Sequence, residues 1–81
     1  MRAVIKFTNG SGQTEYYSPN TNGGYSKYLM DAKVYDYEDD AFWVIHNANI
    51  NYSKLKSPTA ISAIWRTAVV QPVKLVELIY E

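Results

Sequence analysis

A single histidine carries the acid–base chemistry that this sequence offers near neutral pH. The sequence contains one His, His46, and no Cys, and imidazole is the side chain that exchanges a proton near neutrality. A Ser-His-Asp triad would also need a serine on a turn such as Gly-x-Ser-x-Gly, which does not occur in the sequence. We therefore predict that His46 is solvent-exposed or helix-terminal and that the protein is not an enzyme.

Acidic residues cluster between Asp36 and Asp40, and a hard cation needs several carboxylate oxygens of this kind. The cluster lacks the glycine turn and the later glutamate of a calcium-binding loop. Asp36 and Asp39 are better explained as N-cap and first-turn residues of a helix, where carboxylates interact favourably with the helix dipole. We predict no metal site and no cofactor, and the absence of Cys excludes thiolate metal sites and disulfides.

Two glycine-containing segments, Gly10–Gly12 and Asn22–Gly24, are predicted to be turns rather than phosphate-binding loops. A P-loop requires the pattern Gly-x-x-x-x-Gly-Lys-Ser/Thr at the start of a helix, and a dinucleotide site requires three spaced glycines between a strand and a helix. Neither pattern is present. The turns therefore serve the strands beside them.

The first part of the chain predicts a β-hairpin. Arg2–Thr8 is rich in β-branched and aromatic residues, and Asn9–Gly12 supplies the residues that tolerate a tight reversal. Gln13–Ser18 is the second strand, which ends before Pro19. Ala32–Tyr35 is a further short strand.

A first helix is predicted to begin at Tyr37, with Asp36 as its N-cap. Apolar residues follow at helical spacing for about three turns, namely Ala41, Val44, Ile45 and Ala48. The polar residues that come next predict a connection over Asn49–Lys56. This helix would bury one apolar side against the sheet.

The later part of the chain is predicted to hold a second helix and a closing strand. Ser57 and Pro58 have the types preferred at N-cap and N1, so Pro58–Val70 is predicted to be helical. The β-branched residues near its end leave Ile61–Val70 as an alternative strand. After the breaker Pro72, Val73–Tyr80 is predicted to be a central strand or one that is covered on both faces.

These elements predict one α+β domain over residues 1–81, with a small, mainly antiparallel sheet of three to four strands and two helices on one face. The formal net charge is zero, which argues against nucleic-acid binding that ignores sequence. No apolar run reaches the roughly 18 residues of a membrane span. We expect a cytoplasmic protein with no membrane partner.

Aromatic residues are too numerous for one small core, because the sequence has eight Tyr, two Trp and two Phe. The adjacent Tyr16 and Tyr17 must point to opposite faces of a strand. Asp31–Asp40 also carries five acids and one lysine, a local charge of −4. We predict a partner-binding surface that combines aromatic and acidic residues: Tyr16, Tyr17, Tyr35, Tyr37, Glu38, Asp39, Asp40 and Trp43.

The order of these segments resembles short accessory proteins of bacteriophages and prophages over about half the chain. The shared features are a hairpin with Tyr16-Tyr17, the strand Ala32–Tyr35, an acidic helix start before Ala41, and a closing strand over Val73–Glu81. The apolar segment Pro58–Val70 departs from that pattern. The resemblance implies a phage-encoded protein that binds and inhibits a host protein or defence complex, and it brings no catalytic residues. The acidic and aromatic surface would itself suit the basic groove of a nucleic-acid-binding host enzyme.

Two other functions remain open from the sequence. A small-ligand, nucleotide or nucleic-acid binding module would place basic side chains on phosphate, drawn from Lys54, Lys56, Arg66 and Lys74. A homo-oligomeric structural or regulatory domain would pair Val73–Tyr80 or the second helix across a two-fold axis of a homodimer.

Overall fold

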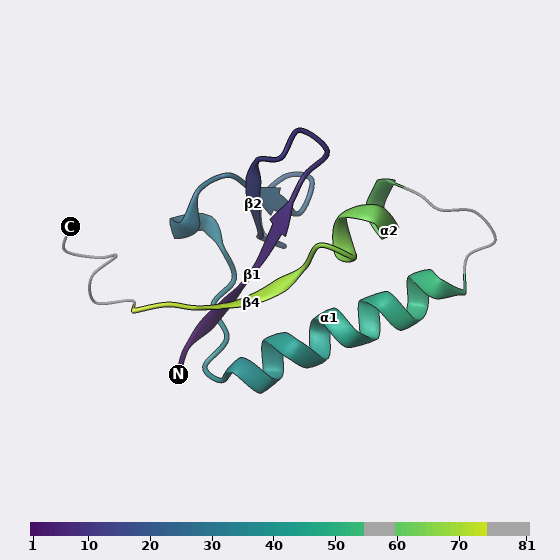
Figure 1. Ribbon diagram of the computed structural model, residues 1–81. Coiled ribbons are helices and arrows are strands. Elements are labelled where there is room, and N and C mark those ends of the chain that lie inside the picture. The colour runs from purple at the N-terminus through teal and green to yellow at the C-terminus, as the bar shows by residue number, and fades with distance from the viewer. Residues whose placement is uncertain (55–59, 75–81) are drawn as a thin grey trace.

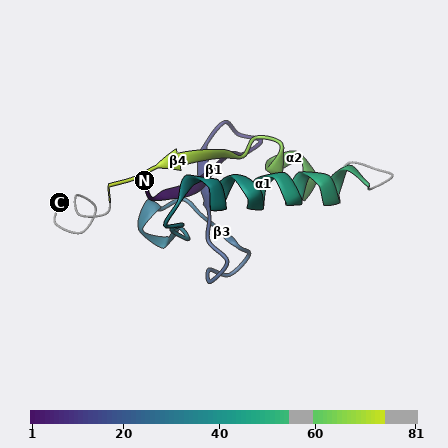
Figure 2. The same cartoon turned by 90° about the horizontal axis from the view of Figure 1, so that it is seen from below.

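A four-stranded antiparallel sheet and two helices make up the fold in the computed structural model, which describes residues 1–54 and 60–74 (Figure 1). Seen from below, α1 runs alongside β4 (Figure 2), and it packs against both β4 and β1. The predicted α+β class is confirmed. The elements, in chain order, are β1 (Ala3–Thr8), β2 (Thr14–Tyr17), β3 (Tyr25–Ser26), a 3-10 helix (Leu29–Asp31), α1 (Glu38–Ser53), α2 (Ala60–Trp65) and β4 (Val69–Pro72).

The predicted hairpin is confirmed, and β1 lies at the centre of the sheet. The strand order is β3-β2-β1-β4, and Lys6 pairs with Tyr16 across the hairpin. The Asn9 side-chain oxygen accepts the backbone N–H groups of Ser11 and Gln13 at 2.9 and 3.0 Å. Gly12 has a φ of 78°, a conformation that glycine adopts without strain. Local turn chemistry therefore sets the hairpin register.

Ala32–Tyr35 does not form the predicted strand and contributes one β-bridge instead. Tyr35 exchanges backbone hydrogen bonds of 2.8 and 3.0 Å with Ala3, and the Lys33 N–H donates to the Tyr17 carbonyl at 2.9 Å. Because β2 ends at Tyr17, this segment occupies the position beside the first residues of β1. The segment forms a single bridge with β1, which is too short a stretch of backbone pairing to be a strand.

The first helix begins later and ends later than the sequence predicts. Tyr37 is the N-cap residue of α1. Among the described residues, no side-chain hydrogen bond caps this end of the helix. Asp36 instead lies 3.7 Å from the Arg2 side chain, and both groups are largely exposed. The helix continues to Ser53 through the predicted connection because Tyr52 packs against the core one turn beyond Ala48. The predicted cap at Asp36 and helix end near Ala48 are therefore wrong.

Neither prediction for the segment after residue 60 holds throughout, because the helix ends at Trp65 instead of Val70 and the strand begins at Val69 instead of Ile61. Residues 60–65 are helical, and Val69–Pro72 is a strand that pairs with β1. Thr67 joins them to the hairpin, because its hydroxyl donates to the Ile64 carbonyl at 2.6 Å and accepts the Thr8 N–H at 2.9 Å. The predicted helix start at Ser57 and Pro58 lies outside the described residues.

Pro72 does not break the chain, because it lies in a strand at the edge of the described sheet. The Val73 N–H donates to the Arg2 carbonyl at 3.0 Å, so Val73 faces β1 and the Pro72 nitrogen faces away from it. A missing N–H on the outer edge costs no ladder hydrogen bond. The predicted strand Val73–Tyr80 falls mostly outside the described residues.

The core lies between the sheet and the two helices and is centred on three aromatic contacts. The ring centroids of Phe7 and Trp65 are 4.9 Å apart, and those of Tyr17 and Trp65 are 5.4 Å apart. Tyr25 packs edge-on against Phe7 at 5.2 Å. Edge-to-face pairs of this kind add stability beyond the burial of their area. The predicted apolar side of the first helix is confirmed, since Ala41, Val44, Ile45 and Ala48 all pack against this core.

Candidate functional site

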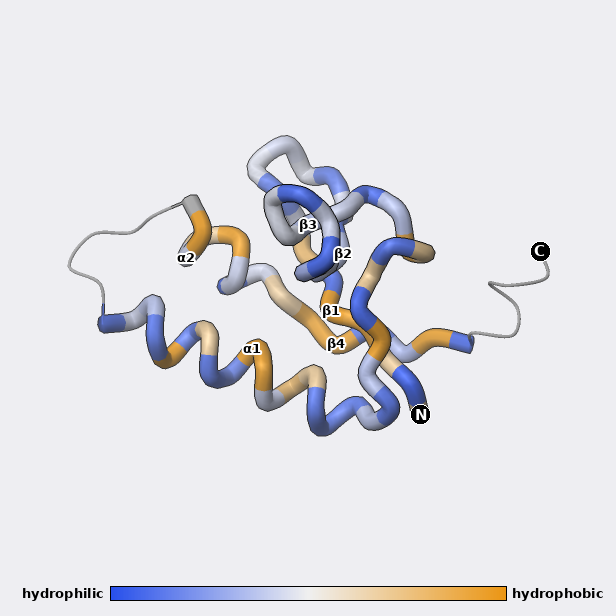
Figure 3. Tube along the Cα trace, turned by 180° about the vertical axis from the view of Figure 1, so that it is seen from behind, coloured by the Kyte–Doolittle hydropathy of each residue, from blue (hydrophilic) through white to orange (hydrophobic). Residues whose placement is uncertain are grey.

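The side of α1 that faces away from the sheet carries large apolar side chains. Phe42 is 54% exposed, Trp43 is 56% exposed and Ile50 is 42% exposed. His46 is exposed between them, one turn from each. We call these four residues the α1 outer face. Figure 3 shows hydrophobic segments recurring along α1 between its two hydrophilic ends, and burial against the sheet accounts for only some of them.

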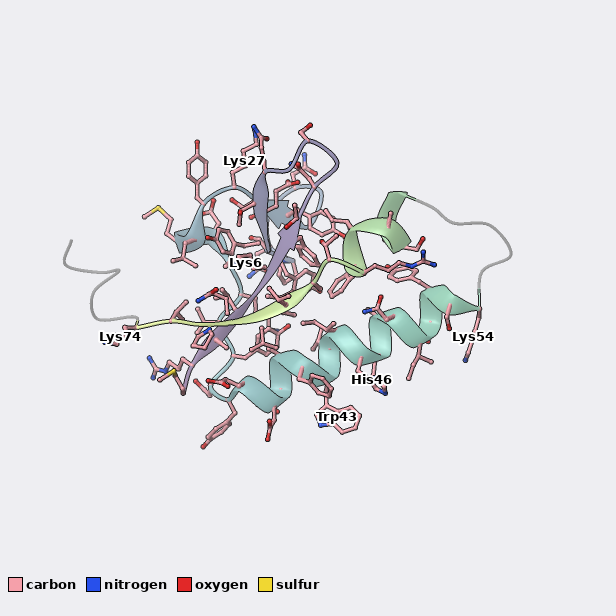
Figure 4. All side chains as sticks on the ribbon, viewed as in Figure 1. Lys6, Lys27, Trp43, His46, Lys54 and Lys74 are labelled. Atoms are coloured by element: carbon pink, nitrogen blue, oxygen red, sulfur yellow. The ribbon has the colours of Figure 1, made fainter. Side chains whose placement is uncertain are left out.

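Three rings of the α1 outer face contact one another. The Phe42 and His46 rings are stacked, with centroids 6.0 Å apart and planes inclined by 10°. Trp43 meets His46 edge-on at 5.5 Å and Phe42 edge-on at 6.0 Å. Trp43 and His46 project away from the sheet (Figure 4). Contacts among the rings reduce the rotamer freedom that each side chain would lose on being covered.

His46 belongs to this ring cluster. It is exposed, as predicted. Within residues 1–54 and 60–74, no hydrogen bond joins its ring to a hydroxyl or a carboxylate, as a catalytic triad would require. The geometry gives the imidazole an aromatic surface role.

Charged residues mark the two ends of the α1 outer face. Glu38, Asp39 and Asp40 occupy the first turn of α1 and are all exposed; we call them the acidic rim. Lys54 lies just after the last helical residue, and it is exposed as well. Figure 4 shows Lys54 at the opposite end of α1 from the acidic rim. The outer face therefore has an acidic end and a basic end.

The structure brings together five of the eight residues that the sequence nominated for partner binding. Tyr37 and Trp43 are exposed close to the three carboxylates of the acidic rim. Tyr17 and Tyr35 pack against the core instead. Tyr16 is half-buried on the other face of the sheet, opposite Lys6. Tyr37, Trp43 and the acidic rim can therefore belong to one continuous surface. Tyr16, Tyr17 and Tyr35 lie outside it.

Tyr35 is held in its uncharged form by its surroundings. Burial raises the pKa of Tyr35 to about 12, with a smaller contribution from Tyr17. The Lys33 ammonium lies 5.4 Å from the centre of the Tyr35 ring. Burial also raises the pKa of Tyr25. At neutral pH these phenols cannot act as general bases, and they serve the packing of the core.

Sequence reasoning missed Phe42 and Ile50 and considered His46 only as a catalytic group. The missed signal was a second periodicity in the same helix. Asp39, Trp43, His46 and Ile50 are separated by four, three and four residues. Residues at this spacing lie on one side of a helix, and two of these four, Trp43 and Ile50, are apolar. This side faces away from the stripe that packs on the sheet.

Two open cavities lined by described residues are weaker candidates for a binding site than the α1 outer face. One of about 280 Å³ is lined by Asn49, Tyr52, Ser53 and Arg66. The other, of about 480 Å³, is mostly apolar and is lined by Thr8, Asn9, Gly10, Ala63, Ile64 and Thr67. Neither lining includes two basic side chains that would hold a phosphate together. The nucleotide-binding alternative gains no support from them.

In the described ranges, no group of three or more His, Cys, Asp or Glu side chains is placed to hold a metal ion. None of the described helices has the length and apolar character needed to span a bilayer. No protein-family model matches this chain, and no curated protein or solved structure matches it either.

Proposed function

We propose that this protein is a non-enzymatic binding module that covers a surface of another protein with the α1 outer face. The supporting observation is that Phe42 and Trp43 are adjacent, more than half exposed and already packed around His46. Aromatic side chains provide about 150–250 Å² of contact area each and are enriched at the centres of protein interfaces. Covering them would release water from the largest exposed rings of the helix.

The acidic rim defines the chemistry of the partner surface. Three carboxylates at the start of α1 add to the negative charge near Asp36, so a basic border around an apolar patch is the complementary surface. Opposite potentials also speed encounter between two proteins. A nucleic-acid-binding enzyme or defence protein of a host cell has such basic surfaces, and a small domain seated there would inhibit it by occlusion.

Affinity capture from a bacterial lysate tests this proposal. The unmodified protein is expected to retain a partner in stoichiometric amount, and the double variant Asp39→Lys, Asp40→Lys is expected to retain roughly tenfold less because it reverses the steering charges. Raising the salt concentration should reduce capture by the unmodified protein.

A control reverses a charge elsewhere. Lys27→Glu changes an exposed residue that precedes α1, outside the acidic segment 31–40, and leaves the acidic rim intact. This control should capture the partner as the unmodified protein does. No stoichiometric partner, or equal capture by the Asp39, Asp40 variant, would contradict the proposal.

A further inference from the structure

The α1 outer face is complementary to a second copy of itself in antiparallel orientation. Asp39 lies at the acidic end and Lys54 at the basic end, about 22 Å apart at the rise of an α-helix. Trp43 and Ile50 lie between them on the same side, with His46 in the middle. An antiparallel neighbour therefore meets apolar groups on either side of the His46 position and opposite charges at both ends.

We infer that two copies of this chain form a homodimer through their α1 outer faces, related by a two-fold axis near His46 and Asn47. Asp39 and Lys54 lie at equal distances along the chain from the point midway between these two residues, and so do Trp43 and Ile50. A two-fold interface requires that if one residue contacts another, the reverse contact also forms. In this register Asp39 of each copy lies opposite Lys54 of the other copy, and Trp43 of each copy lies opposite Ile50 of the other. The two-fold symmetry makes each of these contacts occur twice.

Other ways for two copies to pair fit the described residues less well. A parallel pairing of α1 would place the acidic rims against each other. Strand addition at β4 would use an edge of four residues in which Pro72 presents no N–H outward. The predicted pairing through the second helix is also weakened, because Ile64 and Trp65 of that stripe pack into the core.

The dimer would regulate the proposed binding function. The α1 outer face cannot cover a partner while it is covered by a second copy, so binding of a partner requires the dimer to dissociate. The apparent affinity for the partner would then fall as the concentration of the protein rises. This regulatory step rests on the proposed function, whereas the dimer is a property of the chain alone.

A charge-swap series analysed by sedimentation tests the dimer. The unmodified protein is expected to be dimeric at high micromolar concentration. Asp39→Lys and Lys54→Glu should each weaken the dimer by at least about tenfold, because each places like charges at both ends of the interface. The double variant Asp39→Lys, Lys54→Glu should restore it, because the swapped charges attract again in the antiparallel register alone.

Circular dichroism on every variant checks that the fold is retained, and Lys33→Glu serves as a charge reversal outside α1. A monomeric unmodified protein, or a double variant whose dimer is no tighter than those of the single variants, would overturn the inference.

Lys54→Glu separates the dimer from the proposed function, because this variant keeps the acidic rim. If Lys54→Glu captures the partner but the unmodified protein never dimerises, only the dimer is wrong. If the dimer forms and no partner is captured, only the proposed function is wrong.

Discussion

Trp65→Ala is expected to lower the free energy of unfolding by about 3–5 kcal/mol, the range for loss of a large buried aromatic side chain. Trp65 is 5% exposed and connects α2 to the sheet through edge-on contacts with Phe7 and Tyr17. A small domain has a total stability toward the low end of about 5–15 kcal/mol. The substitution should therefore leave a large fraction of the protein unfolded, as measured by urea denaturation followed by circular dichroism.

Trp65→Phe is the matched control for this prediction. It keeps an aromatic ring against Phe7 and should lose roughly half as much stability or less. If Trp65→Ala lowered the free energy of unfolding by under about 1 kcal/mol, the placement of α2 against β1 would be wrong. A loss of the same size from Trp65→Phe would also contradict the packing described for Phe7 and Tyr17.

Trp43→Ala and Phe42→Ala are each expected to weaken binding of the captured partner by about 30-fold or more. This factor corresponds to the roughly 2 kcal/mol that defines an interface hot spot. Both side chains are more than half exposed in the free protein, so the free energy of unfolding should change by only about 0.5 kcal/mol. Calorimetric titration with the purified partner measures the first effect, and urea denaturation measures the second.

Tyr28→Ala and Met30→Ser are the controls for this pair, because both residues are large and exposed but lie near the 3-10 helix instead of on α1. Their affinities should stay within about threefold of that of the unmodified protein. The interface would have to be moved away from α1 if these controls lost affinity while Trp43→Ala and Phe42→Ala did not.

The sequence predicted those elements whose causes are local. The hairpin follows from β-branched residues around a turn that only Asn and Gly fill easily. The apolar side of α1 that faces the sheet follows from its helical spacing.

The end of α1 could not be predicted from local sequence. The Asn49 side chain donates to the Trp65 carbonyl at 3.3 Å and Tyr52 packs on the core, so tertiary contacts support residues that have weak helix propensity.

The division of the later segment into α2 and β4 also depended on tertiary structure. Residues 61–70 fit a helix by spacing and a strand by β-branching, and pairing of Val69–Pro72 with β1 decides where one changes to the other. The position of Pro72 required knowledge of the sheet order, because proline is tolerated only where its nitrogen faces outward.

The candidate surface was only partly predictable for a related reason. Alternation along β2 showed that Tyr16 and Tyr17 point to opposite faces, but only the sheet order shows which one faces the core. Tyr35 was drawn inward by its bridge to Ala3. Trp43 and Asp39 are exposed because they lie on the side of α1 away from Ala41 and Val44, and Glu38 and Asp40 are exposed in the first turn of the helix.

Site-specific photo-cross-linking is the most direct test that the α1 outer face is covered by another molecule. Phe42 is replaced by the photoreactive residue p-benzoylphenylalanine in one variant, and Met30, which is exposed away from α1, is replaced in another. After irradiation in cells, position 42 should form an adduct with a second copy or with a partner protein, and position 30 should not. Adducts from position 30 alone, or an adduct from position 42 confined to its own chain, would contradict the binding surface proposed for this protein.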